Sequence, residues 1–312
     1  MKKIIVGIFM LSFTLNANAG DVQSIAKFAS PDKARQLLLT EDLFTKSWSQ
    51  FDIDARLQKN NSTKQELFTF ITEQVREWTE EEKEKLNKIF REIDQSVADQ
   101  KFKLNFPEEI YFVKTTALEE GGAGGYTRGN YIVLKSDIMA LPENSVKQTV
   151  IHELFHILTR YDNEFRRDMY AIIGFKLMKP IKYPEAIAHR RITNPDAPQT
   201  DSYVTLRKDG SANYMMILYS DGAYGGGLFF QYLNVGFLQL DAKKQPVVDK
   251  GFPVIHSMNE VEGFFEQIGR NTQYILHPEE IMADNFVFAI NDRKGQPTQK
   301  IVQEIQKRLR KR

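Results

Sequence analysis

The sequence contains no cysteine. This absence excludes disulfides, cysteine nucleophiles and metal sites with thiolate ligands, so any metal ion must be held by histidine, aspartate or glutamate. A chain of 312 residues can build a hydrophobic core without disulfides. The lack of cysteine therefore limits the kinds of catalytic and metal site that the protein can have, but it does not indicate the compartment of the protein.

An excess of charge of one sign is also missing. The 42 lysine and arginine residues balance 41 aspartate and glutamate residues, and the formal net charge is +1. This balance gives no electrostatic basis for binding nucleic acid, so no nucleic-acid partner is expected. Beyond the N-terminal segment, no apolar run reaches the ~20 residues of a spanning helix, and no stable membrane span is expected.

The N-terminal segment has the layout of a secretory signal peptide. Lys2 and Lys3 form a basic start, residues 4–15 are mostly apolar, and residues 17–19 read Ala-Asn-Ala, a small-residue cleavage site. We expect residues 1–19 to be removed and the protein to be exported, either to the periplasm or to the extracellular space. The alternative is an uncleaved anchor, which the short apolar run disfavours.

Residues 20–105 are predicted to form an N-terminal helical region. Within it, apolar residues of the segment 63–100 recur at steps of three and four, with glutamate and lysine on the other face, as in amphipathic helices. We interpret this segment as a helical hairpin packed on the main domain. A coiled coil that binds a partner is the alternative, but the heptads are not sustained.

The main domain is predicted at residues 106–312 and begins with strands. The segments 109–116 and 131–134 are rich in β-branched and aromatic residues, and a glycine-rich patch at 121–125 lies between them. This patch lacks the features of a phosphate-binding loop, so we interpret it as a hairpin or loop. A helix is predicted next, from about Pro142 to Asp162.

A small antiparallel β insertion is predicted at about 176–260. Its strand-like runs read YVTLRK, NYMMILYS and LFFQYLNVGFLQL, with turn signals between them. A helical period returns over residues 260–270 and 277–292, and the chain ends in a basic amphipathic helix at 299–312. The predicted fold class is therefore α+β.

The residues that carry chemistry are HELFH, 152–156. On a helix, His152 and His156 lie one turn apart on the same face, so both imidazoles can reach a common point. Zn²⁺ accepts such nitrogen ligands and keeps a position open for water in catalytic sites. Glu153 can reach that water without being a ligand and can act as its general base. The predicted cofactor is Zn²⁺.

The helix around this motif is apolar on nearly all sides, which is typical of a buried helix. Buried polar groups are costly unless they are paired, and a metal ion would satisfy both histidines and the glutamate together. The alternative is a pair of hydrogen-bonded core histidines beside a buried glutamate.

A third ligand is needed, and the residues just downstream do not supply it. Thr159 and Asp162 stand where the metzincin extension requires glycine and histidine. A glutamate from another helix would complete a set of two histidines and one glutamate. In gluzincins this glutamate typically lies on a helix that reads Glu-x-x-Ala/Ser-Asp, in which the aspartate supports a ligand histidine.

Two segments offer this glutamate. HPEEIMADNF contains Glu280 followed by Asp284 one turn later, and YPEAIAHRR contains Glu185 followed by a histidine instead of the aspartate. We favour Glu280, because it brings its own supporting carboxylate, and keep Glu185 as the alternative third ligand. Glu279 is interpreted as a charge favoured at a helix N-terminus.

These features resemble the zincin-like metallopeptidases, and in particular the gluzincin branch typified by thermolysin. HELFH and EEIMADNF carry the resemblance, which covers residues 106–175 and 262–293. It implies a zincin-like core in which His152, His156 and Glu280 hold zinc, Glu153 is the general base and Asp284 supports a ligand histidine. It also implies that the strand 131–134 lies at the cleft edge, where an extended substrate would pair with it as an additional strand.

The sequence departs from the gluzincin pattern in one respect. Gluzincins commonly place a tyrosine or histidine beyond the third ligand to stabilise the oxyanion, and no tyrosine or histidine follows Glu280. The remaining candidates for this donor are Tyr224, His256, Tyr274, His277 and Arg293. Packing of the tyrosines and helix capping by His277 are the alternative roles.

The leading functional prediction is a secreted or periplasmic zinc metallopeptidase that hydrolyses peptide or protein substrates with a Glu-activated, zinc-bound water. One alternative is a non-catalytic protein that binds zinc and a partner on a zincin scaffold. Another is a zinc amidase acting on cell-wall peptide, which the sequence does not distinguish because specificity depends on the shape of the pocket.

Overall fold

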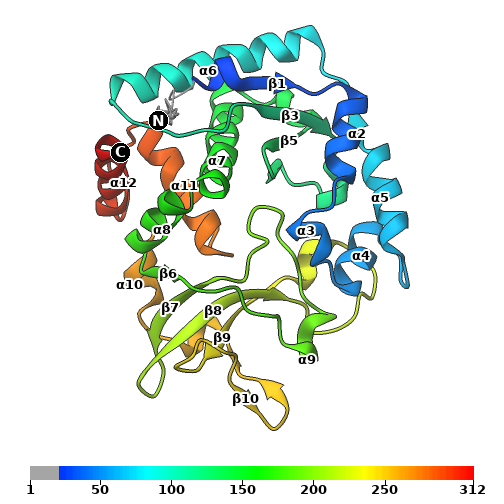
Figure 1. The fold of residues 1–312 in the computed structure, drawn as a ribbon, viewed down its shortest axis with the longest axis vertical. Helices are drawn as coiled ribbons and strands as arrows, with labels where there is room; N and C mark the ends of the chain where they lie inside the picture. Colours follow the sequence, from blue (N-terminus) through cyan, green and yellow to red (C-terminus); the bar gives the residue numbers. More distant parts are fainter. Residues whose placement is uncertain (1–20) are drawn as a thin grey trace, which may run out of the picture.

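The computed structural model describes residues 21–312 (Figure 1). The predicted signal peptide lies outside the described residues. The fold mixes helices with several sheets, which confirms the α+β class. Among the described residues, no helix combines the length and apolar character needed to cross a membrane.

The helices are α1 (Val22–Ile25), α2 (Pro31–Leu39), α3 (Leu43–Lys46), α4 (Gln50–Leu57), α5 (Lys64–Glu73), α6 (Glu80–Asp99), α7 (Glu143–Tyr161), α8 (Asn163–Ile172), α9 (Glu185–Ala188), α10 (Phe264–Ile268), α11 (Pro278–Ile290) and α12 (Gln299–Lys311). The strands are β1 (Ala26–Phe28), β2 (Val75–Arg76), β3 (Ile110–Thr115), β4 (Gly125–Arg128), β5 (Tyr131–Lys135), β6 (Phe175–Leu177), β7 (Ser202–Arg207), β8 (Ser211–Tyr219), β9 (Asn234–Leu240), β10 (Val248–Asp249), β11 (Phe252–Pro253) and β12 (Ile255–His256).

The first sheet joins the N-terminal region to the main domain. Its order is β1-β3-β5-β4, with β1, β3 and β5 parallel and β2 paired to β3. The N-terminal region is therefore mainly helical, as predicted, but it also supplies two short strands that the helical interpretation missed. Three-residue and two-residue strands carry too little periodic signal to be read from sequence.

One edge of this sheet is β4, so the strand at 131–134 is not the edge strand that the sequence predicted. The turn between β4 and β5 contains Gly129, whose φ of 50° is a left-handed conformation that glycine adopts readily. The chain folds back there, so that β4 pairs antiparallel with β5 and covers it. The glycine-rich patch thus leads into the edge strand.

The second sheet is antiparallel, in the order β12-β9-β8-β7-β6, and lies at the opposite end of the long axis (Figure 1). Antiparallel strands are thus present in the segment 176–260, where the sequence predicted them. One strand was predicted too long, because residues Phe229–Tyr232 form a 3₁₀ helix and the strand begins only at Asn234. Helices α2–α5 run along one side of the molecule between the two sheets (Figure 1).

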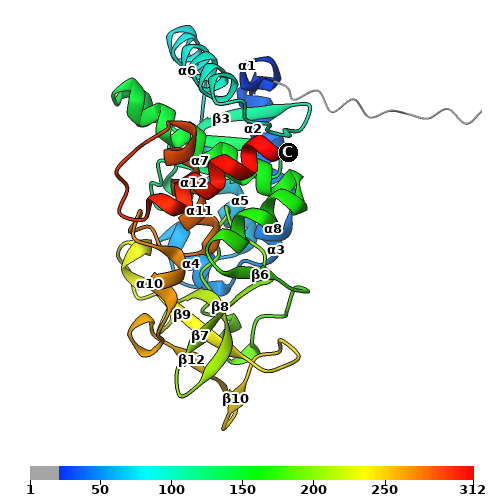
Figure 2. The same cartoon turned by 90° about the vertical axis from the view of Figure 1, so that its left-hand side faces the viewer.

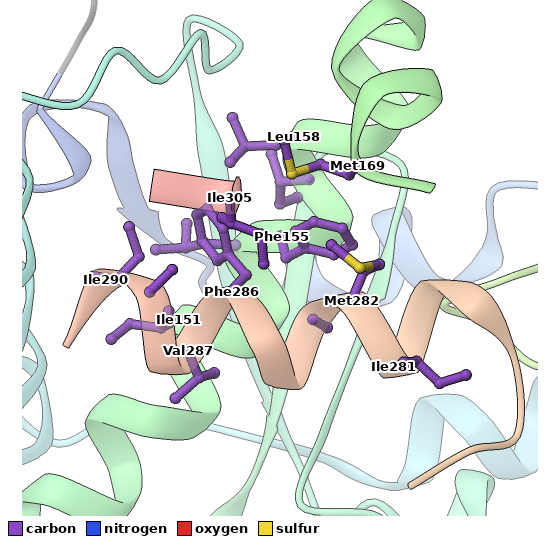
Figure 3. Packing of buried hydrophobic residues seen from close by; sticks show 14 of the residues in the cluster. Ile151, Phe155, Leu158, Met169, Ile281, Met282, Phe286, Val287, Ile290 and Ile305 are labelled. Carbon is purple, nitrogen blue, oxygen red and sulfur yellow. The ribbon is translucent and has the colours of Figure 1, made fainter. Parts of the chain in front are cut away.

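The core that positions the site lies between α7 and α11. Their apolar faces meet through aromatic rings, with the ring centroids of Phe155 and Phe286 5.4 Å apart (Figure 3). Ile151 and Val287 pack in the same cluster, and α12 contributes Ile305. Figure 2 shows α12 lying across α11 and α8. The relative position of α7 and α11 is therefore set by a continuous buried cluster.

Candidate metal centre

Helix α7 carries both histidines on one face. It extends over the predicted range, and Asp162 marks its end because its side chain accepts the backbone N–H of Phe165 at 2.8 Å and caps α8. The ring centroids of His152 and His156 are 4.9 Å apart. His156 is fully buried, whereas the side chain of His152 retains 16% exposure. One histidine is thus enclosed and the other faces the cleft.

Helix α11 brings Glu280 to the two histidines. Pro278 occupies its first turn, where a missing N–H costs nothing, and Glu280 follows in that turn. Glu280 Oε2 lies 3.1 Å from His152 Nε2 and 3.6 Å from His156 Nε2. The three candidate ligand atoms lie within 4.8 Å of one another, close enough for one metal ion to bind all three.

Each imidazole is oriented by a carboxylate on its far nitrogen. His152 Nδ1 lies 3.0 Å from Asp284 Oδ1, and His156 Nδ1 lies 3.0 Å from Glu279 Oε1. Both Nε2 atoms are therefore directed to Glu280. Such outer partners fix the ring orientation and the tautomer of a ligand histidine.

The contact of Glu279 with His156 corrects the sequence interpretation, which gave this residue only a charge effect at the helix end. Tyr170 donates its hydroxyl to Glu279 Oε2 at 2.5 Å, and Thr159 donates to Oε1. The partners of Glu279 lie more than 100 positions earlier in the chain. A sequence signal was nevertheless present, since Glu279 directly precedes Glu280 and Asp284 lies one turn later on the same helix.

The donor set fits zinc. His156 Nε2 is buried and has no hydrogen-bond partner among the described residues, although a buried polar atom normally has one. Two imidazole nitrogens and one carboxylate oxygen form a common catalytic zinc set. Burial raises the pKa of Glu280, but the nearby His156 and His152 outweigh burial and lower it to about 2. Glu280 is thus held as the carboxylate that a metal ligand must be.

Glu153 lies beside this cluster on the side of the edge strand. Its Oε2 accepts the hydroxyl of Thr127 on β4 at 2.7 Å. Burial, followed by the charge of Asp196, raises the pKa of Glu153 to about 7. Gly125 leaves it room, because a Cβ at that position would lie 3.0 Å from Glu153 Oε1. A carboxylate with such a pKa suits proton transfer near neutral pH.

A loop at residues 190–198 reaches the same cluster, and the sequence interpretation assigned it no role in the site. Asn194 donates its amide to Glu280 Oε1, and Asp196 Oδ1 accepts the backbone N–H of Thr127 at 2.6 Å. One oxygen of Asp196 lies within 4.8 Å of donor atoms of both Glu153 and His156. Burial and the charge of Glu280 raise the pKa of Asp196.

The cluster opens into a cleft of about 490 Å³. Residues of α7, α11, the glycine-rich patch and the loop 190–198 form its walls. The lining residues are Ala123, Gly124, Gly125, Gln148, Thr149, His152, Glu153, Asp196, Phe230, Tyr274, Glu280, Asp284, Val287 and Phe288. The histidine that remains partly exposed therefore faces a space large enough for a ligand.

Comparison with known proteins does not name this centre. No family model matches the chain, and neither a curated protein nor a solved structure matches it. The interpretation of the centre therefore rests on its own residues and distances.

Of the predicted oxyanion donors, Tyr274 is the one placed at the cleft. Its ring centroid lies 6.2 Å from that of His152, and its side chain lines the space above the cluster. The residue is 44% exposed, and the nearby charge of Glu280 raises the pKa of Tyr274. Its phenol therefore keeps the proton that an oxyanion donor must provide.

The other four candidates do not line the cleft. Tyr224 donates its hydroxyl to the Gly227 carbonyl, and His256 lies between Lys208 and Gln239 in the second sheet. His277 is the N-cap of α11 and accepts the N–H of Glu279; burial lowers its pKa to about 4. The guanidinium of Arg293 lies over the Phe288 ring, 5.5 Å from its centroid.

Glu185, the alternative third ligand, is also remote from the histidines. It is exposed in the first turn of α9, a four-residue helix that contacts β11 of the separate two-stranded sheet β10-β11. Glu185 is closer to HELFH in sequence than Glu280 is, but the chain after α7 passes through α8 and enters the second sheet at β6.

Proposed function

We propose that the protein is an exported zinc metallopeptidase of the gluzincin type, which hydrolyses peptide bonds. The observation that carries this proposal is the convergence of His152, His156 and Glu280, together with a buried Glu153 beside them. HELFH and the Glu280–Asp284 pair are the features shared with the gluzincins. The nearby cleft supports the proposal further, since a peptide needs access to the centre.

The residues of the chain divide the chemistry between them. His152, His156 and Glu280 would hold a zinc ion, which would supply the Lewis acidity that polarises a carbonyl and eases the deprotonation of water. Glu153 takes the proton from the attacking water and passes it to the leaving nitrogen. The bond from Thr127 to Glu153 Oε2 holds one oxygen in place and leaves the other for this transfer.

Tyr274 is the candidate for stabilising the negative charge that develops on the carbonyl oxygen. It lines the cleft next to His152, and its hydroxyl forms no hydrogen bond within residues 21–312. A donor that points at the developing oxyanion contributes more in a partly enclosed site than in water.

The test is metal analysis and a peptide-library digest of the purified protein, beside Glu153→Gln. We expect one zinc ion per chain in both proteins and cleavage by the native protein alone, because glutamine keeps the shape of glutamate but cannot accept the proton. Glu185→Gln is the matched control and should cleave like the native protein.

Two results would overturn the proposal. Absence of bound metal after careful reconstitution with zinc would remove its basis. Bound zinc without cleavage of any peptide would favour the binding-protein alternative, since the metal centre would then serve no peptidase.

A further inference from the structure

The edge strand β4 meets the cleft along only part of its length. Lys135 donates its backbone N–H to the Gly124 carbonyl, and Thr127 donates its own N–H away from the sheet, to Asp196. Since the direction of hydrogen bonding alternates along an antiparallel pair, Gly125 and Thr127 turn their backbone groups outward. Gly125 lines the cleft, but the N–H of Thr127 is occupied.

The loop that closes this end is firmly held. The backbone N–H of Thr193 donates to Asp52 at 2.9 Å, and its carbonyl accepts a bond from Arg56 at 3.1 Å. Arg160 of α7 donates to the Pro195 carbonyl at 2.7 Å. The side chains of Asp52 and Arg56 are fully buried in one ion pair. A peptide along β4 therefore meets a fixed wall at Asp196.

The wall lies close to the reaction centre. Asp196, Glu153 and His156 offer ligand atoms within 4.8 Å of one another. An extended peptide advances about 3.3 Å per residue. The space between the centre and the wall thus accepts about one residue, whereas the opposite direction, past Ala123 and Gly124, follows the open cleft.

The direction of the bound peptide follows from the strand. β4 runs from the open cleft toward the wall, because Gly125 precedes Thr127. A peptide that pairs antiparallel with β4 places its N-terminus at the wall and runs outward into the cleft. Parallel pairing is somewhat less stable and would place a C-terminal carboxylate beside Asp196, where like charges repel.

The wall offers a carboxylate to the terminal group. Asp196 Oδ1 accepts the N–H of Thr127, and its side chain forms no ion pair within residues 21–312. The carboxylate of Asp196 is half-buried and lines the cleft. An ammonium group in the cleft can therefore pair with a carboxylate that is not engaged in another ion pair, and an opposite charge within a few ångströms favours the carboxylate.

A side pocket opens next to the same position. It has a volume of about 60 Å³ and shares Ala123, Gly125, Asp196, Phe230 and Tyr274 with the cleft. Its other walls are mainly apolar and come from the second sheet and the loops around it. They include Ile192, Leu218, Phe229, Leu233 and Leu276. An apolar side chain of a residue bound beside Asp196 would be removed from water there.

We propose that the protein is an aminopeptidase, in which Asp196 binds the free α-ammonium of a peptide and the side pocket takes an apolar first side chain. This inference rests on the proposed function. Water adds across the first peptide bond: its oxygen joins the carbonyl carbon, the C–N bond breaks, and Glu153 transfers a proton to the leaving nitrogen. The products are one amino acid and the peptide shortened by one residue.

The experiment compares a fluorescent peptide that begins with leucine with its N-acetylated form. The native protein loaded with zinc should release free leucine from the first peptide and leave the second uncut, as followed by mass spectrometry. Zinc-loaded Glu153→Gln provides a readout without turnover. Its Kd for the peptide with a free N-terminus should be at least 10-fold lower than its Kd for the N-acetylated peptide. Internal cleavage of the acetylated peptide at a comparable rate, or equal Kd values, would overturn the inference.

Failure of the proposed function gives a different pattern. If neither peptide is cut, the peptidase proposal fails, and the binding preference of Glu153→Gln alone decides whether Asp196 recognises an ammonium group. The two proposals are thus separated within one set of proteins.

Asp196→Asn tests the residue itself. Asparagine keeps an oxygen for the Thr127 N–H but loses the charge, so the preference for the free N-terminus should fall below about 3-fold. Asp249→Asn in the exposed β10 is the matched control and should keep the native preference. If Asp196→Asn does not fold, the comparison of free and acetylated peptides by Glu153→Gln still decides.

The side pocket is tested with a series of first residues. Leucine and methionine should be released faster than alanine, and alanine faster than aspartate. Leu276→Phe narrows the pocket and should reduce the ratio of leucine to alanine release. Equal release of leucine and aspartate by the native protein would overturn the assignment of the pocket.

Discussion

At the scale of single residues, the centre consists of two imidazoles, each held by a carboxylate. His152 pairs with Asp284 and His156 pairs with Glu279, so both rings are fixed before a metal arrives. Against the opposing effect of burial, the bonds to Asp284 and Glu280 raise the pKa of His152. The same carboxylates that would orient a neutral ligand therefore also favour a proton on it, and metal binding competes with protonation.

Glu280→Ala should lower zinc affinity by more than about 100-fold, because loss of a ligand exceeds the 10–100-fold effect of an outer partner. Competition with a chromophoric chelator measures the affinity. Glu185→Ala is the control and should bind zinc like the native protein. A large loss in Glu185→Ala with little change in Glu280→Ala would reverse the assignment of the third ligand.

Glu119 provides a pH-dependent test away from the candidate metal centre. Its Oε1 accepts hydroxyls from Thr115 and Tyr126, whereas Oε2 is buried without a partner among the described residues. Burial raises its pKa from 4.5 to about 7. Between these values the folded protein holds a proton that the unfolded chain releases. The free energy of unfolding therefore falls as pH rises, by about 1.4 kcal/mol per pH unit.

Glu119→Gln should remove this contribution, because glutamine does not titrate and still accepts both hydroxyl bonds. Relative to the native protein, the variant should gain stability between pH 5 and pH 7 and keep a constant difference above that range. Denaturant unfolding of the metal-free proteins at several pH values measures this. Parallel pH profiles would show that Glu119 titrates normally in the folded state.

At the scale of elements, the centre depends on how α7 packs against α11. His152 and Glu280 come from different helices, and no backbone hydrogen bond joins these helices in the described part of the chain. Their separation is set by Phe155, Phe286 and their neighbours (Figure 3). Core packing is close, so a lost ring is not replaced without a cavity.

Phe286→Ala should destabilise the protein by about 3–5 kcal/mol, the cost of removing a buried aromatic side chain. Denaturant unfolding measures the loss. Zinc affinity should fall as well, since Glu280 lies on the same helix. Phe252→Ala, at an exposed position of β11, is the matched control and should stay within about 0.5 kcal/mol of the native protein. Equal stability of the two variants would contradict the packing argument.

At the scale of the whole molecule, the candidate site gathers distant segments. The histidines come from α7, Glu280 from α11, Thr127 from the edge of the first sheet and Asp196 from a loop leading to the second. The buried pair of Asp52 and Arg56 ties that loop to the N-terminal helices. A metal ion at the centre would thus connect segments of the folded chain that are far apart in the sequence.

Zinc should therefore raise the unfolding temperature. At a free concentration 100-fold above its Kd, a ligand bound only by the folded state adds about 2.7 kcal/mol, which corresponds to a few degrees for a domain of this size. Thermal scans with zinc and with a chelator measure the shift, and Glu280→Ala should lose it. An equal shift in that variant would indicate that zinc binds elsewhere.

The sequence alone was sufficient for features whose cause is local. The 3.6-residue period placed α7, and the spacing of His152 and His156 put both on one face. Proline at the first turn and Asp284 one turn later marked α11 and its glutamate. Alternating strands and turn residues predicted the antiparallel insertion, because side-chain burial on a sheet follows a period of two.

Only the tertiary structure decided features that depend on contacts between distant segments. The chain reversal at Gly129 put β4 outside β5, and the loop 190–198 reached the centre because Asp52 and Arg56 anchor it. Glu279 acquired its role from Tyr170 and His156, both remote in sequence. Local periodicity does not predict such contacts between distant segments. The wall at Asp196 and the supporting role of Glu279 could therefore be identified only in the folded structure.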